Sequence, residues 1–154
     1  TGREKKWKFP KRSPLCGGDG TIERVPGEAR HRCAVSGSYT QVARTLAYFT
    51  GKSALDIDGM GRKTVELLME HELISAFDDF FTLTRDELLA LPGFKEKSVD
   101  KLIAAIEEGK RVPLDRLLVG LSILHVGEET AYVLAQRFRA ITALRTATET
   151  DLAR

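Results

Sequence analysis

From residue 40 onward, apolar side chains recur every three or four positions, which is the spacing of one face of an α-helix. Stripes of this kind cover residues 42–49, 65–73, 99–106, 114–121 and 131–138. Thr84 and Glu87 have the spacing of a helix capping box, and Gly109 stands where a helix would stop. The pattern predicts a mainly α-helical domain over residues 39–154, with the stripes packed as its core.

Residues 1–38 show no helical period and are rich in glycine and proline. Residues 21–25 alternate between apolar and polar side chains as a short strand does, and a Pro-Gly turn follows. Residues 30–35 are a suitable second strand. The sequence therefore predicts a small loop-and-hairpin module at residues 10–38, preceded by a basic segment at residues 1–9.

Three short breaks interrupt the helical part, and each one opens a new apolar stripe. They are Asp58-Gly59-Met60-Gly61, Pro92-Gly93-Phe94-Lys95 and Leu124-His125-Val126-Gly127. Their near-equal spacing indicates an internal repeat. Residues 148–153 resemble residues 84–89, so a fourth repeat is expected to begin there, with its break just past Arg154. We therefore expect the sequence to be a piece of a longer protein.

A tight turn at the start of a helix leaves backbone N–H groups unpaired beside the positive end of the helix dipole. Because glycine lets a ligand approach the backbone closely, such a turn can bind a phosphate without reading bases. We expect the apolar middle residue of each break to point inward and the cations near the first two breaks to meet phosphates. The third break has His125 in place of the first glycine, and Glu128 and Glu129 follow it, which would repel phosphate. The candidate contacts are Gly59, Met60, Gly61, Arg62, Lys63, Gly93, Phe94, Lys95, Lys97, His125, Val126 and Gly127. An array of helices that only pack together is the alternative.

These breaks resemble the helix-hairpin-helix motif of DNA repair and replication proteins, most closely over residues 54–68. Together with the preceding module, they resemble the middle of bacterial NAD⁺-dependent DNA ligase. The likeness covers residues 10–154 and includes Pro14-Leu15-Cys16-Gly17-Gly18 and Arg32-Cys33. Its most specific parts are residues 53–61 and 118–131. It implies a mainly α fold, in which a tandem helix-hairpin-helix array follows a small zinc-ribbon-like β-hairpin. It also implies a fragment that grips duplex DNA around a nick, with the other ligase domains as partners and residues 1–9 as the linker from the preceding domain.

The resemblance implies a four-cysteine zinc module, but this chain departs from it. Cys16 and Cys33 match two of the ligand positions, whereas Ser13 and Ser38 occupy the other two. A serine hydroxyl is a poor zinc ligand, because structural zinc sites use thiolates and imidazoles. His31 is a candidate third ligand, although it would lie two residues from Cys33 on the same strand. We therefore expect a degenerate ribbon without zinc, in which the cysteines are small buried residues or an unbonded neighbouring pair.

The catalytic apparatus of a ligase is missing from this chain. The resemblance implies a lysine nucleophile in a Lys-x-Asp-Gly motif, but Gly17 and Asp56 stand at the lysine positions of the two Asp-Gly pairs. By the same likeness, NAD⁺ serves the parent enzyme and binds outside this fragment. We expect the fragment to be inactive alone.

Charge and length refine the expected partner and compartment. The 154 residues carry a net charge of +2. Residues 1–63 hold 13 Lys or Arg against 6 Asp or Glu, whereas residues 64–154 hold 11 against 16. A basic front half favours a polyanionic partner. No apolar run approaches the roughly 18 residues of a membrane span, and two cysteines are too few for a disulfide scaffold. We expect a cytoplasmic, nucleoid-associated monomer that contacts no membrane.

Two other functions stay open at this stage. A helix-hairpin-helix module of another DNA-repair protein, such as a nuclease subunit or a junction binder, would prefer branched DNA. A protein-interaction module would bind no DNA, and the acidic second half of the chain favours it. Trp7 fits packing on a neighbouring domain better than stacking on a base. Arg116 fits either a phosphate contact or a solvated loop.

Overall fold

The computed structural model describes residues 7–27 and 29–152. These residues form two compact units, which join between Val42 and Ala43. In the described ranges, no helix is both long enough and apolar enough to cross a membrane. Most of the linker expected at residues 1–9 lies outside the described residues.

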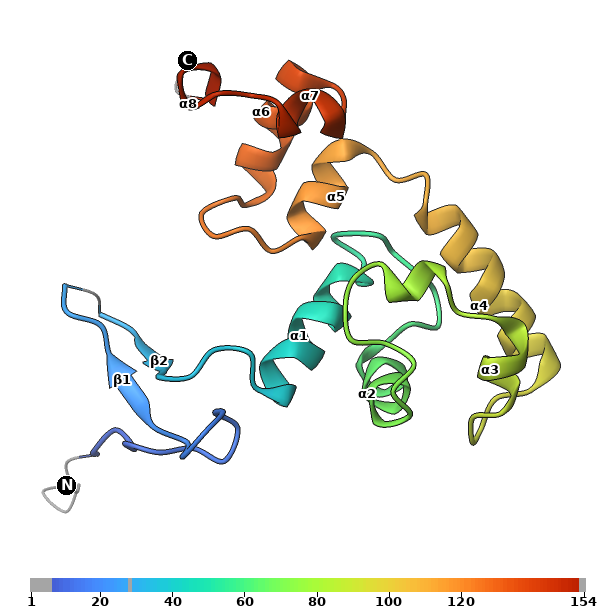
Figure 1. The fold of residues 1–154 in the computed structure, drawn as a ribbon, viewed down its shortest axis with the longest axis horizontal. Coiled ribbons are helices and arrows are strands. Elements are labelled where there is room, and N and C mark those ends of the chain that lie inside the picture. Colours follow the sequence, from blue (N-terminus) through green and yellow to red (C-terminus); the bar gives the residue numbers. More distant parts are fainter. Residues whose placement is uncertain (1–6, 28, 153–154) are drawn as a thin grey trace, which may run out of the picture. The chain divides into compact units, whose positions relative to one another are not determined.

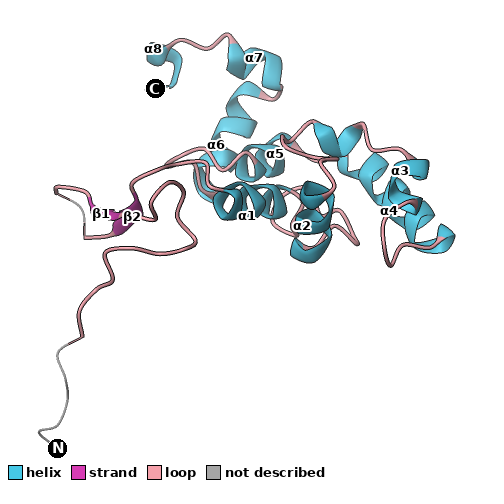
Figure 2. Ribbon diagram, turned by 60° about the horizontal axis from the view of Figure 1, so that its bottom comes forward, coloured by secondary structure: helices cyan, strands magenta, loops and turns pink. Residues whose placement is uncertain are grey.

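The N-terminal unit is built on a two-stranded antiparallel sheet, drawn in magenta in Figure 2. Strand β1 (Ile22–Arg24) pairs with β2 (His31–Cys33), with Ile22 opposite Cys33 and Arg24 opposite His31. This confirms the hairpin predicted from the alternating pattern. The ring of His31 stacks on Phe9 with 3.8 Å between ring centroids, and Phe9 meets the edge of Trp7.

The structure corrects the expectation for the two cysteines. Cys16 and Cys33 form a disulfide, so they are not an unbonded pair, and neither sulfur is a free thiolate that could hold a metal. The serines at the other two expected ligand positions make local hydrogen bonds. Ser13 Oγ accepts from the Leu15 N–H at 3.2 Å, and Ser38 Oγ donates to the Leu15 carbonyl at 3.2 Å. Across residues 7–27 and 29–152, no cluster of three His, Cys, Asp or Glu side chains is placed to hold a metal ion.

Helices make up the rest of the chain, as the apolar stripes predicted (Figure 1). They are α1 (Tyr39–Phe49), α2 (Arg62–Glu70), the 3-10 helix η1 (Asp79–Phe81), α3 (Arg85–Leu89), α4 (Glu96–Gly109), α5 (Leu114–Gly120), α6 (Glu128–Phe138), α7 (Ile141–Arg145) and α8 (Glu149–Leu152). The capping box at the start of α3 is present, and α4 ends at Gly109, as expected. The second stripe, by contrast, extends to residue 73, but α2 ends at Glu70 because Glu72 adopts a left-handed φ of 57°.

The core of the helical unit includes a large group of buried side chains and a smaller cluster near the C-terminal helices. The larger one surrounds Phe49 and Phe80, whose rings lie 6.1 Å apart between centroids, and both side chains are fully buried. Thr50, at the end of α1, is buried with them, and its hydroxyl donates to the Met60 carbonyl at 3.0 Å. The smaller cluster gathers side chains of α5 and α6 with one residue of the turn between them and one of α7. Its members are Leu114, Leu118, Val119, Val126, Ala131, Leu134 and Leu144.

Candidate nucleic-acid interface

The three breaks seen in the sequence fold into three turns with the same backbone geometry. Gly59, Gly93 and His125 occupy equivalent positions and all have left-handed φ values, of 86°, 86° and 67°. Each turn is closed by a backbone hydrogen bond from the next residue to a carbonyl three positions earlier. These bonds are Met60 N to Ile57 O at 3.0 Å, Phe94 N to Leu91 O at 3.4 Å and Val126 N to Ile123 O at 3.0 Å. The third turn therefore keeps the hairpin geometry even though histidine replaces glycine.

The apolar residues in the middle of the three turns are buried to different extents. Met60 is 2% exposed, which confirms that it points inward. Phe94 and Val126 are half-buried. Val126 packs against the cluster between α5 and α6. The first turn is thus the one held most firmly by its own side chain.

A helix begins directly after each turn. Gly61 precedes α2, Lys95 precedes α4 and Gly127 precedes α6, and none of these three residues caps its helix with a side-chain hydrogen bond. In α2 and α6, the first N–H groups to pair belong to the fourth helical residues, Val65 and Ala131. The N–H groups of the first helical turn have no intrahelical partner, so they are available to an anion at the positive end of the helix.

Neither the backbone conformation nor the packing requires glycine at positions 61 and 127. Their φ values are −74° and −89°, which any residue adopts, and a Cβ atom at either position would meet nothing within 4 Å. Helices prefer Ser, Asp, Asn, Thr and Gly at this position, and of these only glycine has no side chain that caps the free N–H groups. Glycine instead leaves the N–H groups open and the space in front of them empty.

Charge differs between the turns. Arg62 and Lys63 open α2, and both are exposed, as are Lys95 and Lys97 at the start of α4. Arg62 Nε also pairs with Glu66 Oε1 at 2.8 Å, one helical turn onward. At the third turn, the exposed residues that open α6 are Glu128 and Glu129. Asp58 and Glu96 are acidic residues of the first two turns, but the cations outnumber them there, so these turns are net positive. The third turn is acidic, as the sequence indicated.

A groove of about 360 Å³ lies between the first and second turns. Gly59 and Thr64 line it on one side, and Gly93 and Ser98 line it on the other. A charged pair spans it, because Lys101 Nζ of α4 lies 2.7 Å from Asp58 Oδ2 of the first turn. The hydrogen bond and positive charge of Lys101 lower the pKa of Asp58, and the same contact raises the pKa of Lys101.

The sequence interpretation missed Lys101, because the residue lies outside every break and its partner is far away in the chain. One signal was available. Lys101 stands four residues after Lys97, so the two lysines lie on one face of the same helix.

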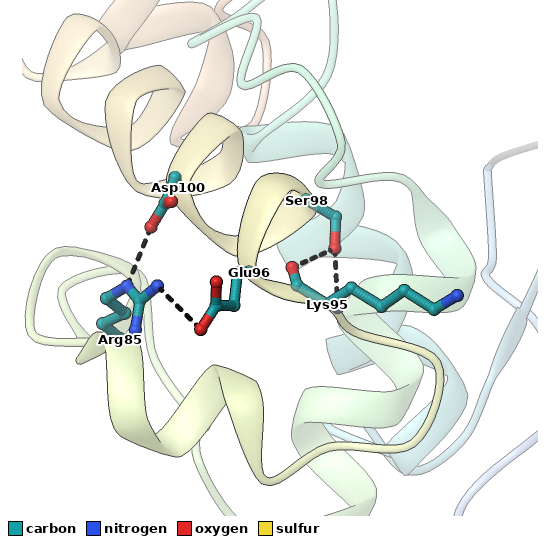
Figure 3. A network of polar contacts seen from close by, with 5 residues as sticks. All are labelled: Arg85, Lys95, Glu96, Ser98 and Asp100. Atoms are coloured by element: carbon teal, nitrogen blue, oxygen red, sulfur yellow. Dashed lines mark hydrogen bonds and ion pairs between the residues drawn. The ribbon is translucent and has the colours of Figure 1, made fainter.

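Other charged residues near the turns have structural roles. Arg85 Nε of α3 pairs with Asp100 Oδ1 of α4 at 2.8 Å, and Arg85 also lies 4.0 Å from Glu96 (Figure 3). On the same helix, Ser98 Oγ accepts from the Lys95 N–H at 2.9 Å and donates to the Lys95 carbonyl at 2.7 Å, which fixes the start of α4. The Arg85 contacts link α3 to the outer face of α4, and the Ser98 bonds hold the first turn of α4.

Arg116 joins α5 to the segment that leads into the first turn. Its guanidinium donates to the Lys52 carbonyl at 2.7 Å and lies 3.8 Å from Asp56 Oδ2. The solvated-loop alternative for Arg116 is therefore wrong, because the side chain lies on α5 and donates a hydrogen bond to a distant segment of the chain.

Comparison with known proteins finds matches over the segments that contain these turns. The family model described as SAM-like Helix-hairpin-helix tandem matches residues 52–108, and the one described as Helix-hairpin-helix motif matches residues 116–154. Among curated proteins, the DNA ligase of Lysinibacillus sphaericus is 37% identical over 146 residues, which is 95% of this chain and 22% of the ligase. The DNA ligase of Anoxybacillus flavithermus is 38% identical over 99% of this chain and 22% of its own length. That of a Sulfurihydrogenibium species is 41% identical over 99% of this chain and 21% of its own length. The chain thus spans about a fifth of the length of the ligases it matches.

Proposed function

We propose that this chain, which is homologous over nearly its whole length to a segment of bacterial DNA ligases, holds duplex DNA around a nick through backbone phosphates. The homologues and the tandem helix-hairpin-helix domains support DNA binding by a ligase fragment. Phosphate contacts alone carry no sequence information, so the grip is independent of sequence. The whole enzyme would use NAD⁺ to adenylylate itself, transfer AMP to the 5′-phosphate of the nick and join the ends. Residues of this chain position the duplex and take no part in those chemical steps.

The observation that carries the proposal is the glycine at the end of the first turn. Gly61 stands at a helix start with ordinary backbone angles and open space in front of it. A glycine that folding does not require, placed where a capping residue would stabilise the helix, is explained by a ligand that needs both the free N–H groups and the space. Arg62 and Lys63 follow immediately and supply positive charge for a phosphate.

The decisive experiment replaces Gly61 by serine in a duplex-binding assay. Gly61→Ser supplies a hydroxyl that accepts the same N–H groups as a phosphate, so the helix start should be as stable as before or more stable. Affinity for every duplex sequence should fall about tenfold, because the cap both fills the space and uses the donors. Fluorescence anisotropy with nicked and intact duplexes at several salt concentrations measures both the affinity and the salt dependence. Each phosphate contact contributes about 0.9 to the slope of log affinity against log salt.

A matched control adds the same cap at a helix that follows no hairpin turn. Ala140 precedes α7, is exposed and makes no side-chain cap. Ala140→Ser should leave duplex affinity unchanged. If Gly61→Ser and Ala140→Ser behave alike, the first turn is not a phosphate site.

The same assay separates the two rival functions. A preference for branched over nicked DNA would favour a module of another repair protein. Absence of salt-dependent duplex binding by the unaltered chain would contradict the proposal and favour a protein-interaction module.

A further inference from the structure

The first hairpin turn carries an acidic residue where phosphates are expected. Asp58 comes directly before Gly59, lines the groove between the first two turns, and has a side chain that is 71% exposed. A carboxylate at this place repels a phosphate that lies close to it. Asp58 therefore opposes the proposed function unless its charge is balanced.

The balancing charge comes from the opposite wall of the groove. Lys101 projects from α4, is 75% exposed, and its ammonium lies 2.7 Å from the Asp58 carboxylate. The nearest cation along the chain, Arg62, is paired with Glu66 instead. The lowered pKa of Asp58 and the raised pKa of Lys101 agree with a pair that is fully charged at neutral pH.

We infer that Lys101 is an internal counter-ion, which masks Asp58 and thereby lets a DNA backbone lie against the first two hairpin turns. The inference rests on the proposed function, and it assigns a role to a residue outside all three turns. Lys101 acts through Asp58 and is thus a positioning and charge-balancing residue, distinct from the lysines that meet phosphates. An exposed ion pair contributes little to folding stability, so the value of this one lies in the charge it cancels.

A double-mutant cycle on the pair tests the inference. Lys101→Gln leaves a bare carboxylate and should weaken binding to all duplexes about fivefold. Asp58→Asn together with Lys101→Gln restores a neutral site and should return the affinity to within about twofold of the original chain. Asp58→Asn alone leaves a free ammonium and should strengthen binding. Both side chains are exposed, so the variants should fold normally, which thermal melting checks.

Arg85→Gln is the matched control, because it removes one cation and leaves Asp100 unmasked on the same helix as Lys101. Duplex affinity should not change in this variant, because Arg85 does not line the groove. An equal loss in Arg85→Gln and Lys101→Gln would mean that only net charge matters, and the inference would be wrong.

The outcomes separate this inference from the proposed function. If the unaltered chain binds no duplex, both fail. If it binds and Lys101→Gln binds equally well, only the counter-ion role fails. A double variant that stays as weak as Lys101→Gln, with a salt slope lower by about 0.9, would show that Lys101 meets a phosphate directly. A test without DNA follows the Asp58 carboxyl by nuclear magnetic resonance during a pH titration. The carboxyl pKa should rise when Lys101 is replaced, and an unchanged pKa would overturn the pair itself.

Discussion

At the scale of single residues, the left-handed position of each hairpin turn decides which side chain it accepts. A glycine adopts a positive φ without a steric penalty, whereas any other residue pays for the contact between its Cβ and the backbone. The first two turns have glycine there, but the third has His125 at a φ of 67°. The third turn thus keeps its shape at a local cost, which contacts such as those of Val126 with the smaller cluster offset.

This cost gives a prediction about stability. His125→Gly should raise the free energy of unfolding by about 0.5–1 kcal/mol, because relief of the left-handed strain exceeds the added entropy of the unfolded chain. Urea unfolding followed by circular dichroism measures the change. Gly127→Ser is the control, since that position has an ordinary φ of −89° and open space around it, and serine is a favoured helix N-cap, so this variant should not lose stability. A destabilised His125→Gly variant would mean that the imidazole makes a contact worth more than the strain.

At the scale of secondary-structure elements, periodicity predicted the long helices well. The stripes around residues 42–49, 99–106 and 131–138 correspond to α1, α4 and α6, because these helices bury one face against the core. Capping chemistry predicted the start of α3. Short elements such as η1 and α7 went unpredicted, because so few residues cannot display a period.

Periodicity and capping patterns could not predict contacts between distant parts of the chain. The bond between Cys16 and Cys33 depends on how the hairpin brings the end of β2 beside the loop that holds Cys16, and the sequence interpretation took the pair to be unbonded. The link from Arg116 to Lys52 joins residues 64 positions apart. The Asp58–Lys101 pair likewise requires two hairpins to face one groove. Sequence patterns report which face of an element is buried, but not which element covers it.

The start of η1 provides a prediction about pH. Asp79 accepts the N–H groups of Ser75 and Ala76 at 2.6 and 2.8 Å, and these bonds lower the pKa of its carboxyl. A carboxyl with a lowered pKa in the folded state stabilises the fold above its unfolded value of about 3.9 and loses that contribution as pH falls through the folded value. We therefore expect Asp79→Asn to reduce stability at pH 7 and to have little effect at pH 2. Thermal melting of both proteins across this range tests it, and a difference that persists undiminished at pH 2 would contradict it.

At the scale of the whole helical unit, α3 and α8 begin in the same way but are buried to different extents. Thr148 and Asp151 form the same reciprocal hydrogen bonds at the start of α8 as Thr84 and Glu87 form at the start of α3. Helix α3 lies against α4, as Figures 1 and 2 both show. We propose that, in the longer ligases, the helix after a fourth hairpin packs against α8 as α4 packs against α3.

The leucines after the two capping boxes provide the test. Leu88 is completely buried, whereas its counterpart Leu152 is 51% exposed. In this chain, Leu88→Ser should lower the free energy of unfolding by about 3 kcal/mol or more, and Leu152→Ser by less than about 0.5 kcal/mol. In a chain extended by the segment that follows in the homologous ligases, Leu152→Ser should become destabilising by about 2 kcal/mol, because the new helix would bury that side chain. Urea unfolding of these three variants, each compared with its unaltered chain, measures the differences. If Leu152→Ser leaves the free energy of unfolding of the extended chain unchanged, no following helix covers α8 in the way that α4 covers α3.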